Sequence, residues 1–129
     1  MGGGGTMDSD VYRRFAEEWV ASWNSHDLER ILSHYAEDVV YRSPFVAQLQ
    51  GVPDGVLVGK PALRAYVQAG LQRYPELRFV GPRVFAGAGS LVLEYESVNG
   101  LLAAETFVLD RDGRACQVFC HYRPRRLDP

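Results

Sequence analysis

A chain of 129 residues is long enough for one domain built around one hydrophobic core. Its hydrophobic content of 47% and charged content of 23% are those of an ordinary soluble globular protein. The net charge of −2 gives no attraction to nucleic acid or to an anionic membrane, and no apolar stretch approaches the length of a membrane span, so we expect neither as a partner.

The ends of the chain differ in composition from the middle. Residues 1–9 begin with Met1 and four glycines and are predicted to form a disordered leader, ahead of a domain over residues 10–123 and a tail over residues 124–129. Cys116 and Cys120, four residues apart in a predicted strand, would lie about 13 Å apart, too far for a disulfide. Reduced thiols, with no secretory signal before the first helix, predict a cytoplasmic protein.

Three helices are predicted in the first part of the chain. The first begins at the capping residues Asp8–Asp10 and ends at Asn24-Ser25-His26, with Phe15, Trp19 and Trp23 recurring every four residues along one face. Asp27 caps a second, shorter helix. The third begins near Pro61, which suits a first helical turn, and ends before Pro75.

Strands account for most of the remainder. A short strand over residues 38–43 stops at Pro44, and residues 45–59 are predicted to form a long loop that is either a lid over a pocket or a packed surface loop. Four further strands are predicted at 77–86, 90–98, 101–110 and 115–123, with Asn99-Gly100 as a hairpin signal. Helices followed by a meander of strands indicate an α+β domain with the helices on one sheet face.

Glu105 is the most informative residue. It lies in Leu101–Leu109, where seven of nine residues are apolar. A carboxylate in such a strand must be paired, protonated or solvated inside a cavity, because burying it bare is too costly. Glu105 therefore either lines an internal pocket, where loss of water would raise its pKa toward neutrality, or bonds a buried tyrosine or arginine and only organises the core.

Three segments carry a family resemblance: Trp23-Asn24-Ser25-His26-Asp27-Leu28, Tyr35-Ala36-Glu37-Asp38-Val39-Val40-Tyr41-Arg42-Ser43-Pro44 and Gly59-Lys60-Pro61-Ala62-Leu63. In this layout the sequence resembles the nuclear transport factor 2-like superfamily, which includes ketosteroid isomerases and SnoaL-like polyketide cyclases. The resemblance implies a cone-shaped α+β barrel: a strongly curved, mostly antiparallel sheet, covered on its concave face by three N-terminal helices, around a deep apolar pocket. It also implies a homodimer formed through the convex sheet face.

The resemblance also assigns roles, and this sequence departs from them. The general base of ketosteroid isomerases falls at Ser43, their oxyanion-hole tyrosine at Trp19, and their protonated aspartate at Glu105. A serine cannot act as an unaided base near neutral pH. Isomerisation by the usual route is therefore not expected.

Strand alternation selects the strand residues that should face the pocket, and the helices supply Trp19, Trp23 and Tyr66. Glu105 is the candidate catalytic residue. The candidate ligand-binding residues are Trp19, Trp23, Tyr41, Ser43, Tyr66, Tyr95, Phe107, Val118, Cys120 and Tyr122. For the tyrosines and tryptophans, simple core packing is the alternative. Cys116 is also predicted to face inward, and Phe119 and His121 outward; a one-residue slip would turn His121 inward.

Three functions fit these features. The first is a cofactor-independent acid–base enzyme that uses Glu105 on a small apolar molecule, by isomerisation, cyclisation, dehydration or hydrolysis. The second is a non-catalytic binder of a hydrophobic metabolite, and the third is a dimeric assembly module whose pocket is incidental. His26, His34 and His121 have no metal-ligand spacing, so neither a metal nor a cofactor is expected.

Overall fold

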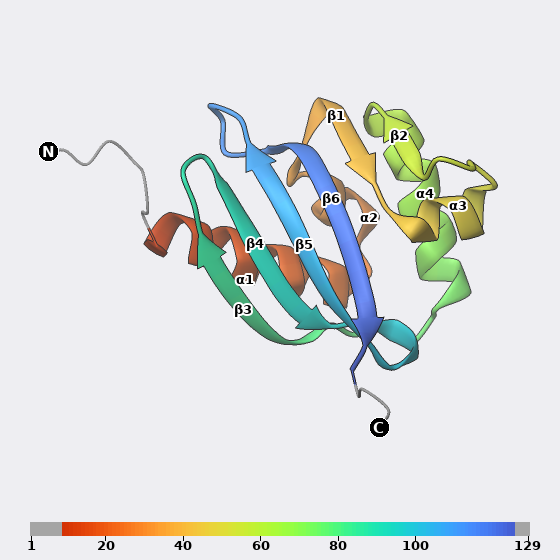
Figure 1. The fold of residues 1–129 in the computed structure, drawn as a ribbon. Helices are drawn as coiled ribbons and strands as arrows, with labels where there is room; N and C mark the ends of the chain where they lie inside the picture. Colours follow the sequence, from red (N-terminus) through yellow and green to blue (C-terminus); the bar gives the residue numbers. More distant parts are fainter. Residues whose placement is uncertain (1–8, 126–129) are drawn as a thin grey trace, which may run out of the picture.

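The computed structural model describes residues 9–125, with four α-helices and two strands in the first part and four further strands after them (Figure 1). The helices are α1 (Ser9–Ser25), α2 (Leu28–Leu32), α3 (Pro44–Gln50) and α4 (Lys60–Arg73), with a short 3₁₀ turn, η1 (Val98–Gly100). The strands are β1 (Tyr35–Arg42), β2 (Val56–Val58), β3 (Val80–Ala86), β4 (Ser90–Glu96), β5 (Leu101–Leu109) and β6 (Ala115–Pro124). The predicted leader lies outside the described residues except for Ser9, which is helical, and so do residues 126–129 of the predicted tail.

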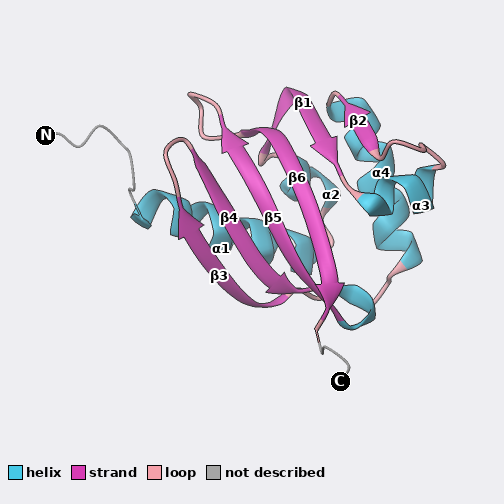
Figure 2. Ribbon diagram, in the orientation of Figure 1, coloured by secondary structure: helices cyan, strands magenta, loops and turns pink. Residues whose placement is uncertain are grey.

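One mixed sheet holds all six of these strands, in the order β2-β1-β6-β5-β4-β3. The pairing of β1 with β6 is parallel and the other four pairings are antiparallel. The sheet curves, and the helices cover one of its faces while the other is left open (Figures 1 and 2). This is the predicted α+β cone, with a mostly antiparallel sheet.

The N-terminal helices form where the sequence places their signals. The Asp27 side chain accepts from the backbone N–H of Arg30 at 3.1 Å and caps α2, and Pro61 lies in the first turn of α4. In the aromatic stripe of α1, Trp19 and Trp23 are buried, with Trp19 1% exposed, and Phe15 is partly buried. No helix within residues 9–125 is both long and apolar enough to cross a membrane.

The predicted loop over residues 45–59 is wrong, because it contains α3 and β2. Ser43 caps α3 by accepting from the backbone N–H of Phe45 at 3.1 Å, Pro44 occupies the first turn, and Gly51 ends the helix with a φ of 68°. A Ser-Pro start with a glycine seven residues after the proline is a helix signal. The segment is a packed part of the domain, since Val46 is fully buried, and the described fold has four α-helices rather than three.

The inward position predicted for Cys116 is also wrong. Val108 pairs with Gln117 while Leu109 pairs with Ala115, so β6 carries one extra residue, a β-bulge, at this point. The bulge turns Ala115 into the core, and the Cys116 thiol instead donates to the carbonyl oxygen of Val108 at 3.4 Å. Beyond the bulge the predicted register holds: Val118 and Cys120 are buried and His121 is exposed.

Candidate functional site

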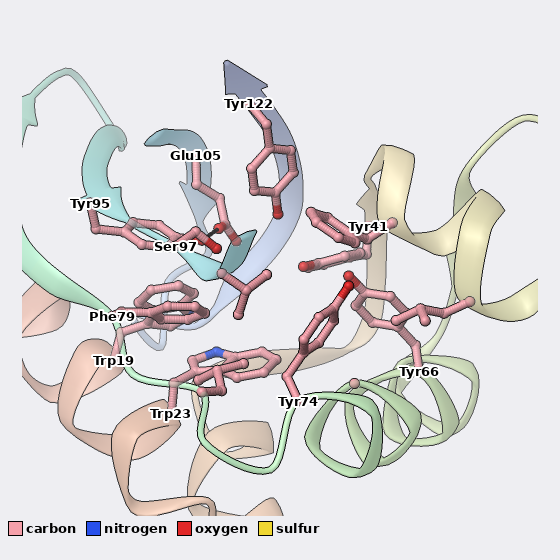
Figure 3. A pocket seen from close by; sticks show the side chains of 15 residues that line it. Trp19, Trp23, Tyr41, Tyr66, Tyr74, Phe79, Tyr95, Ser97, Glu105 and Tyr122 are labelled. Atoms are coloured by element: carbon pink, nitrogen blue, oxygen red, sulfur yellow. Dashed lines mark hydrogen bonds between the residues drawn. The ribbon is translucent and has the colours of Figure 1, made fainter. Parts of the chain in front are cut away.

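A hollow lies between α1, α4 and the covered face of the sheet (Figure 3). The open space inside it is small, about 40 Å³ on the scale used for cavity volumes, and about 450 Å³ when the gaps between the lining atoms and the open mouth are counted. The lining is aromatic and aliphatic with a few polar tips: Trp19, Trp23, Tyr41, Phe45, Leu49, Tyr66, Gly70, Tyr74, Leu77, Phe79, Tyr95, Ser97, Val98, Glu105 and Tyr122. An apolar cleft with a small number of placed polar groups is the usual form of a small-molecule site.

Glu105 belongs to this lining and is buried. It stands on β5 between Leu93 of β4 and Cys120 of β6, and it is 1% exposed. The hydroxyl of Tyr95 donates to Oε1 at 2.6 Å, while Oε2 is buried and makes no hydrogen bond. The structure thus combines the two readings of the sequence, because one oxygen bonds a buried tyrosine and the other is left without a partner at the hollow.

The environment of Glu105 raises its pKa toward neutral pH. Removal from water raises its pKa from 4.5 to about 7, against the hydrogen bond from Tyr95 and the nearby Cys120 thiol, which both lower it. No arginine or lysine lines the hollow among residues 9–125, so no cation counters the desolvation there. A carboxyl group in this state can both give and take a proton near neutral pH.

Tyrosine hydroxyls surround the hollow: Tyr122 lies beside Glu105, and Tyr66 and Tyr74 lie on the other side (Figure 3). The side chains of Tyr41, Tyr66, Tyr74 and Tyr122 point their oxygens toward its centre (Figure 3). Burial raises the pKa of Tyr41, Tyr66 and Tyr122, so they remain protonated and able to donate hydrogen bonds. The hydroxyl of Ser43 interacts with those of Tyr66 and Tyr122 from behind.

The two tryptophans of α1 line the same hollow in different hydrogen-bonding states. The Nε1–H of Trp19 donates to the hydroxyl of Tyr35 at 2.9 Å, and its ring stacks on Phe79 with centroids 5.6 Å apart. Trp23 Nε1 is buried near the same Tyr35 hydroxyl but makes no hydrogen bond. Trp19 therefore makes the well-formed contact with Tyr35, whose hydroxyl oxygen has a second lone pair on the side of Trp23.

The structure brings together seven of the eleven candidate residues named from the sequence. Glu105, Trp19, Trp23, Tyr41, Tyr66, Tyr95 and Tyr122 line the hollow.

Four candidates are buried without lining it: Ser43, Phe107, Val118 and Cys120. Phe107 is covered by the rings of Trp19 and Phe15, at centroid distances of 5.3 and 5.2 Å. Ser43 caps α3. Strand alternation places a side chain on a face but does not tell how deep under its neighbours it lies.

The residues that the sequence reasoning missed come from outside the strands. Leu77 and Phe79 precede β3, Ser97 and Val98 belong to the β4–β5 turn, and Tyr74 follows α4. Tyr66, Gly70 and Tyr74 recur at four-residue spacing, and this helical signal would have added Tyr74 to the candidates. Leu77 and Phe79 alternate within the strand predicted over residues 77–86, and Phe45 and Leu49 of α3 are four residues apart, so these pairs also carried a signal. Ser97 and Val98 carry none.

The histidines do not gather at the hollow. His26 Nε2 bonds the carbonyl oxygen of Leu77 at 2.8 Å, His34 Nε2 lies 3.8 Å from Glu18, and His121 lies exposed on the outer face of the sheet. Over residues 9–125 no group of three or more His, Cys, Asp or Glu side chains is arranged to hold a metal ion.

Comparison with known proteins agrees with this architecture. The family model of the SnoaL-like domain matches residues 16–122. The chain belongs to the SnoaL-like domain family. A SnoaL-like protein of unknown function from Burkholderia thailandensis E264 is 36% identical, with a TM-score of 0.87 over 92% of this chain and 98% of that one. Among curated proteins, no match to this chain was found.

More distant structures of SnoaL-like and related proteins share the fold. An NTF2-like protein from Anabaena variabilis has a TM-score of 0.72 at 15% identity, over 95% of this chain and 94% of that one. SalBIII, described as an epoxide hydrolase/cyclase-like enzyme in pyran ring formation in the polyether salinomycin, has a TM-score of 0.68 at 18% identity, over 90% and 93%. At these identities the likeness is one of fold.

Proposed function

We propose that this SnoaL-like protein binds a small, largely apolar molecule in the hollow and uses Glu105 to transfer a proton on it, without a cofactor. One observation carries the proposal: a buried carboxyl group at the hollow has one oxygen held by Tyr95 and the other unpartnered. Its pKa of about 7 supplies both protonation states at neutral pH.

The tyrosines supply the second half of the chemistry. A carbonyl or hydroxyl oxygen of the ligand, placed in the hollow near Glu105, would find neutral hydrogen-bond donors in the hydroxyls of Tyr41, Tyr66 and Tyr122. Such donors stabilise negative charge that develops on oxygen as a proton moves. Isomerisation, cyclisation, dehydration and hydrolysis all include such a step.

The usual ketosteroid isomerase route does not fit this site. Ser43 stands where that enzyme has its base, and its hydroxyl accepts from the backbone N–H of Phe45 and neighbours two tyrosine hydroxyls. It acts as a helix cap, and no basic group stands at this position. The proposed chemistry therefore depends on one carboxyl group that both donates and accepts.

The test compares two glutamates on neighbouring strands. Glu105→Gln keeps the shape and the Tyr95 contact but removes the titrating proton, whereas Glu94→Gln makes the same change on the opposite face of the sheet. We expect Glu105→Gln to reduce turnover at least a hundredfold. The variant should stay folded with a melting temperature that is not lowered, because it no longer has a buried carboxyl group to ionise. Glu94→Gln should retain turnover. Full activity of Glu105→Gln, measured on the substrate that the wild type converts, would refute the proposal.

A non-catalytic binder is the second candidate, and the role of Ser43 as a cap favours it. In that case Glu105 only orients the ligand. Mass spectrometry of the ligand that copurifies with the protein, before and after incubation, separates the two. A ligand recovered chemically unchanged supports binding, and a converted ligand supports catalysis.

We also propose a homodimer through the outer face of the sheet. There Phe85, Val92, Thr106 and Phe119 stand in register across four strands, and the guanidinium of Arg42 lies over the Phe119 ring, 4.6 Å from its centroid. Thr106→Glu would place a charge in the middle of this row, so we expect it to convert a dimer to a monomer in light scattering at micromolar concentration. A monomeric wild type would contradict this proposal.

If apolar ligands also fail to raise the melting temperature of a dimeric protein, an assembly role is favoured over a binding one.

A further inference from the structure

The hollow as it stands is too small for the kind of molecule that the proposed function requires. Its open space of about 40 Å³ has room for no more than a few water molecules, whereas sites for small organic ligands usually span roughly 300–1,000 Å³. A ligand that reaches Glu105 therefore has to displace part of the lining. The contacts of the lining residues tell which part is held most lightly.

The mouth of the hollow is marked by the lining residues that are partly exposed, since the other lining residues are buried. They are Leu49, Tyr74, Ser97, Val98 and Tyr122. Beyond the mouth lies a surface groove formed by residues 73–78 and 97–99, with about 390 Å³ of open space on the same scale. The wall between the hollow and this groove consists of the residues that line both: Tyr74, Leu77, Ser97 and Val98.

Tyr74 has the largest side chain in this wall, and only its backbone is firmly held. Its N–H donates to the carbonyl oxygen of Gly70 at 2.9 Å, and its own carbonyl oxygen accepts from the N–H of Leu77 at 3.0 Å. The side chain is held from the surface, because Nδ2 of Asn99 donates to its hydroxyl at 3.2 Å and the Arg73 guanidinium lies 5.0 Å from its ring centroid. Asn99 and Arg73 are both exposed, so water can replace these contacts.

The opposite side of the hollow is fixed by buried contacts. The hydroxyl of Tyr95 donates to Glu105 at 2.6 Å, and Nε1 of Trp19 donates to the hydroxyl of Tyr35 at 2.9 Å. Tyr95 is 2% exposed and Trp19 is 1% exposed, so neither can turn without breaking a hydrogen bond that water does not reach. Of the two sides, the one that contains Tyr74 is therefore the side that opens at lower cost.

We propose that Tyr74 is the gate of the hollow: when its side chain turns out of the mouth, the hollow and the groove become one cleft that a small organic molecule can enter. The open form need only be a minor population, because a ligand that binds it alone shifts the equilibrium toward it. This inference rests on the proposed function, since a gate serves only a hollow that takes a ligand. It adds the route of entry and the residue that controls it.

Collisional quenching of tryptophan fluorescence by acrylamide tests the gate without a ligand. Both tryptophans of the chain line the hollow and are 1% and 5% exposed, so this small neutral quencher reaches them when the hollow opens. Tyr74→Phe keeps the ring but loses the bond from Asn99. Asn99→Gly removes the same bond from the other side, and glycine suits the φ of 58° at this position. We expect each variant to raise the quenching constant, measured from fluorescence lifetimes, about two- to fivefold.

Two alanine variants complete this test. Tyr74→Ala should raise the quenching constant further, because no ring is left to close the mouth. Leu71→Ala is the matched control: it removes a half-buried side chain from the last turn of α4 that does not line the hollow, so the constant should stay at the wild-type value. If Tyr74→Ala alone raises the constant and Tyr74→Phe and Asn99→Gly do not, Tyr74 is a fixed wall and the gate is refuted. An equal rise in Leu71→Ala would refute it too, since that result indicates general loosening.

Binding kinetics separate a failure of the gate from a failure of the proposed function. The probe is N-phenyl-1-naphthylamine, which is neutral, apolar and too large for the closed hollow, and its binding is followed by the quenching of tryptophan emission in stopped flow. Because Tyr74→Phe loosens the closed form, we expect it to bind the probe about two- to fivefold more tightly, through faster association at an unchanged dissociation rate. Binding that is equal or weaker in this variant would overturn the gate and leave the hollow as a binding site. If the quenching results hold but wild-type protein does not bind the probe, the gate stands and the proposed binding function is contradicted.

Discussion

Glu105 and Glu94 show how differently the two faces of one sheet treat the same side chain. They stand on adjacent strands, one residue out of register, since Glu105 pairs with Leu93 and Glu94 pairs with Ala104. Glu105 is 1% exposed, bonded to Tyr95, and has a pKa raised to about 7 by loss of water. Glu94 points outward, with Nη1 of Arg83 4.0 Å from its Oε1. A single step along the pleat therefore separates a group able to transfer protons from a solvated surface charge.

The aromatic residues follow the same division. On the covered face Trp19, Phe79 and Tyr95 pack against one another, with the Phe79 and Tyr95 centroids 4.5 Å apart. On the outer face Phe85 is 50% exposed and Phe119 contacts the guanidinium of Arg42. The covered face is thus a packed aromatic core around a hollow. The outer face retains exposed apolar surface that the proposed dimer would cover with a second copy of the chain.

The largest expected difference between the faces is in packing energy. Trp19→Ala removes a fully buried ring that four aromatic rings and the Tyr35 hydroxyl contact, so we expect it to lower the free energy of unfolding by about 3–5 kcal/mol. Phe85→Ala is the control, with an expected loss below about 0.5 kcal/mol by denaturant titration. A larger loss at Phe85 would mean that the outer face is covered in solution, as in the proposed dimer.

The next difference concerns pH. Because the pKa of Glu105 in the folded protein, about 7, lies above its ordinary 4.5, the folded state holds this proton more tightly than the unfolded chain does. The free energy of unfolding should therefore fall as pH rises from 4.5 to about 7, by roughly 3 kcal/mol from this group alone. The measurement is urea unfolding at a series of pH values, for wild type and for Glu105→Gln.

The contribution of Glu105 is the difference between the wild-type and Glu105→Gln curves of unfolding free energy against pH. Burial lowers the pKa of His34, so that residue makes stability rise with pH in an overlapping range and would mask part of the slope in the wild type alone. Subtracting the Glu105→Gln curve removes the contribution of His34. Glu94→Gln should leave the slope unchanged, and a difference curve without a slope would contradict the raised pKa of Glu105.

How much the sequence reveals depends on the element. The Asp27 cap of α2, the stripe of Trp19 and Trp23 and the burial of Glu105 come from cap signals, periodicity or a single anomalous residue, and these predictions hold in the structure. Of the cap predicted at Asp8–Asp10, Asp8 lies outside the described residues, and Ser9 and Asp10 are already helical. The loop predicted over residues 45–59 is wrong because its glycines and prolines were taken as loop signals. Pro44 and Gly51 instead mark the two ends of the helix α3.

The alternation of apolar and polar residues could not predict how deeply a side chain is buried or where the register of a strand shifts. The bulge at Cys116 changes which residue faces inward, and nothing in the alternation of β6 announces it. Phe79 and Val98 reach the hollow from irregular backbone, whose course is set by tertiary contacts such as the hydrogen bond from the Phe79 backbone N–H to Asn24 Oδ1 at 2.7 Å. Glu105 could be identified from the sequence because burying a carboxyl group has a high free-energy cost, so its presence in an apolar strand is unusual. Burying an apolar side chain has no such cost, so the apolar residues of the lining do not stand out in the sequence.

The smallest expected effect tests the contact that holds Glu105 in place. Tyr95→Phe removes the donor to Oε1 and leaves the ring, so above pH 7, where Glu105 is ionised, we expect a loss of about 1.5–3 kcal/mol in the free energy of unfolding. Since this hydrogen bond lowers the pKa of Glu105, its removal should also raise that pKa further, and the stability loss should shrink below pH 7. Tyr74→Phe is the matched control, because its half-buried hydroxyl bonds only the exposed Asn99 and water can replace that partner. If Tyr95→Phe lowers the free energy of unfolding by the same amount from pH 5 to pH 9, the tyrosine contributes packing alone. Its hydroxyl would then have no effect on the ionisation of Glu105.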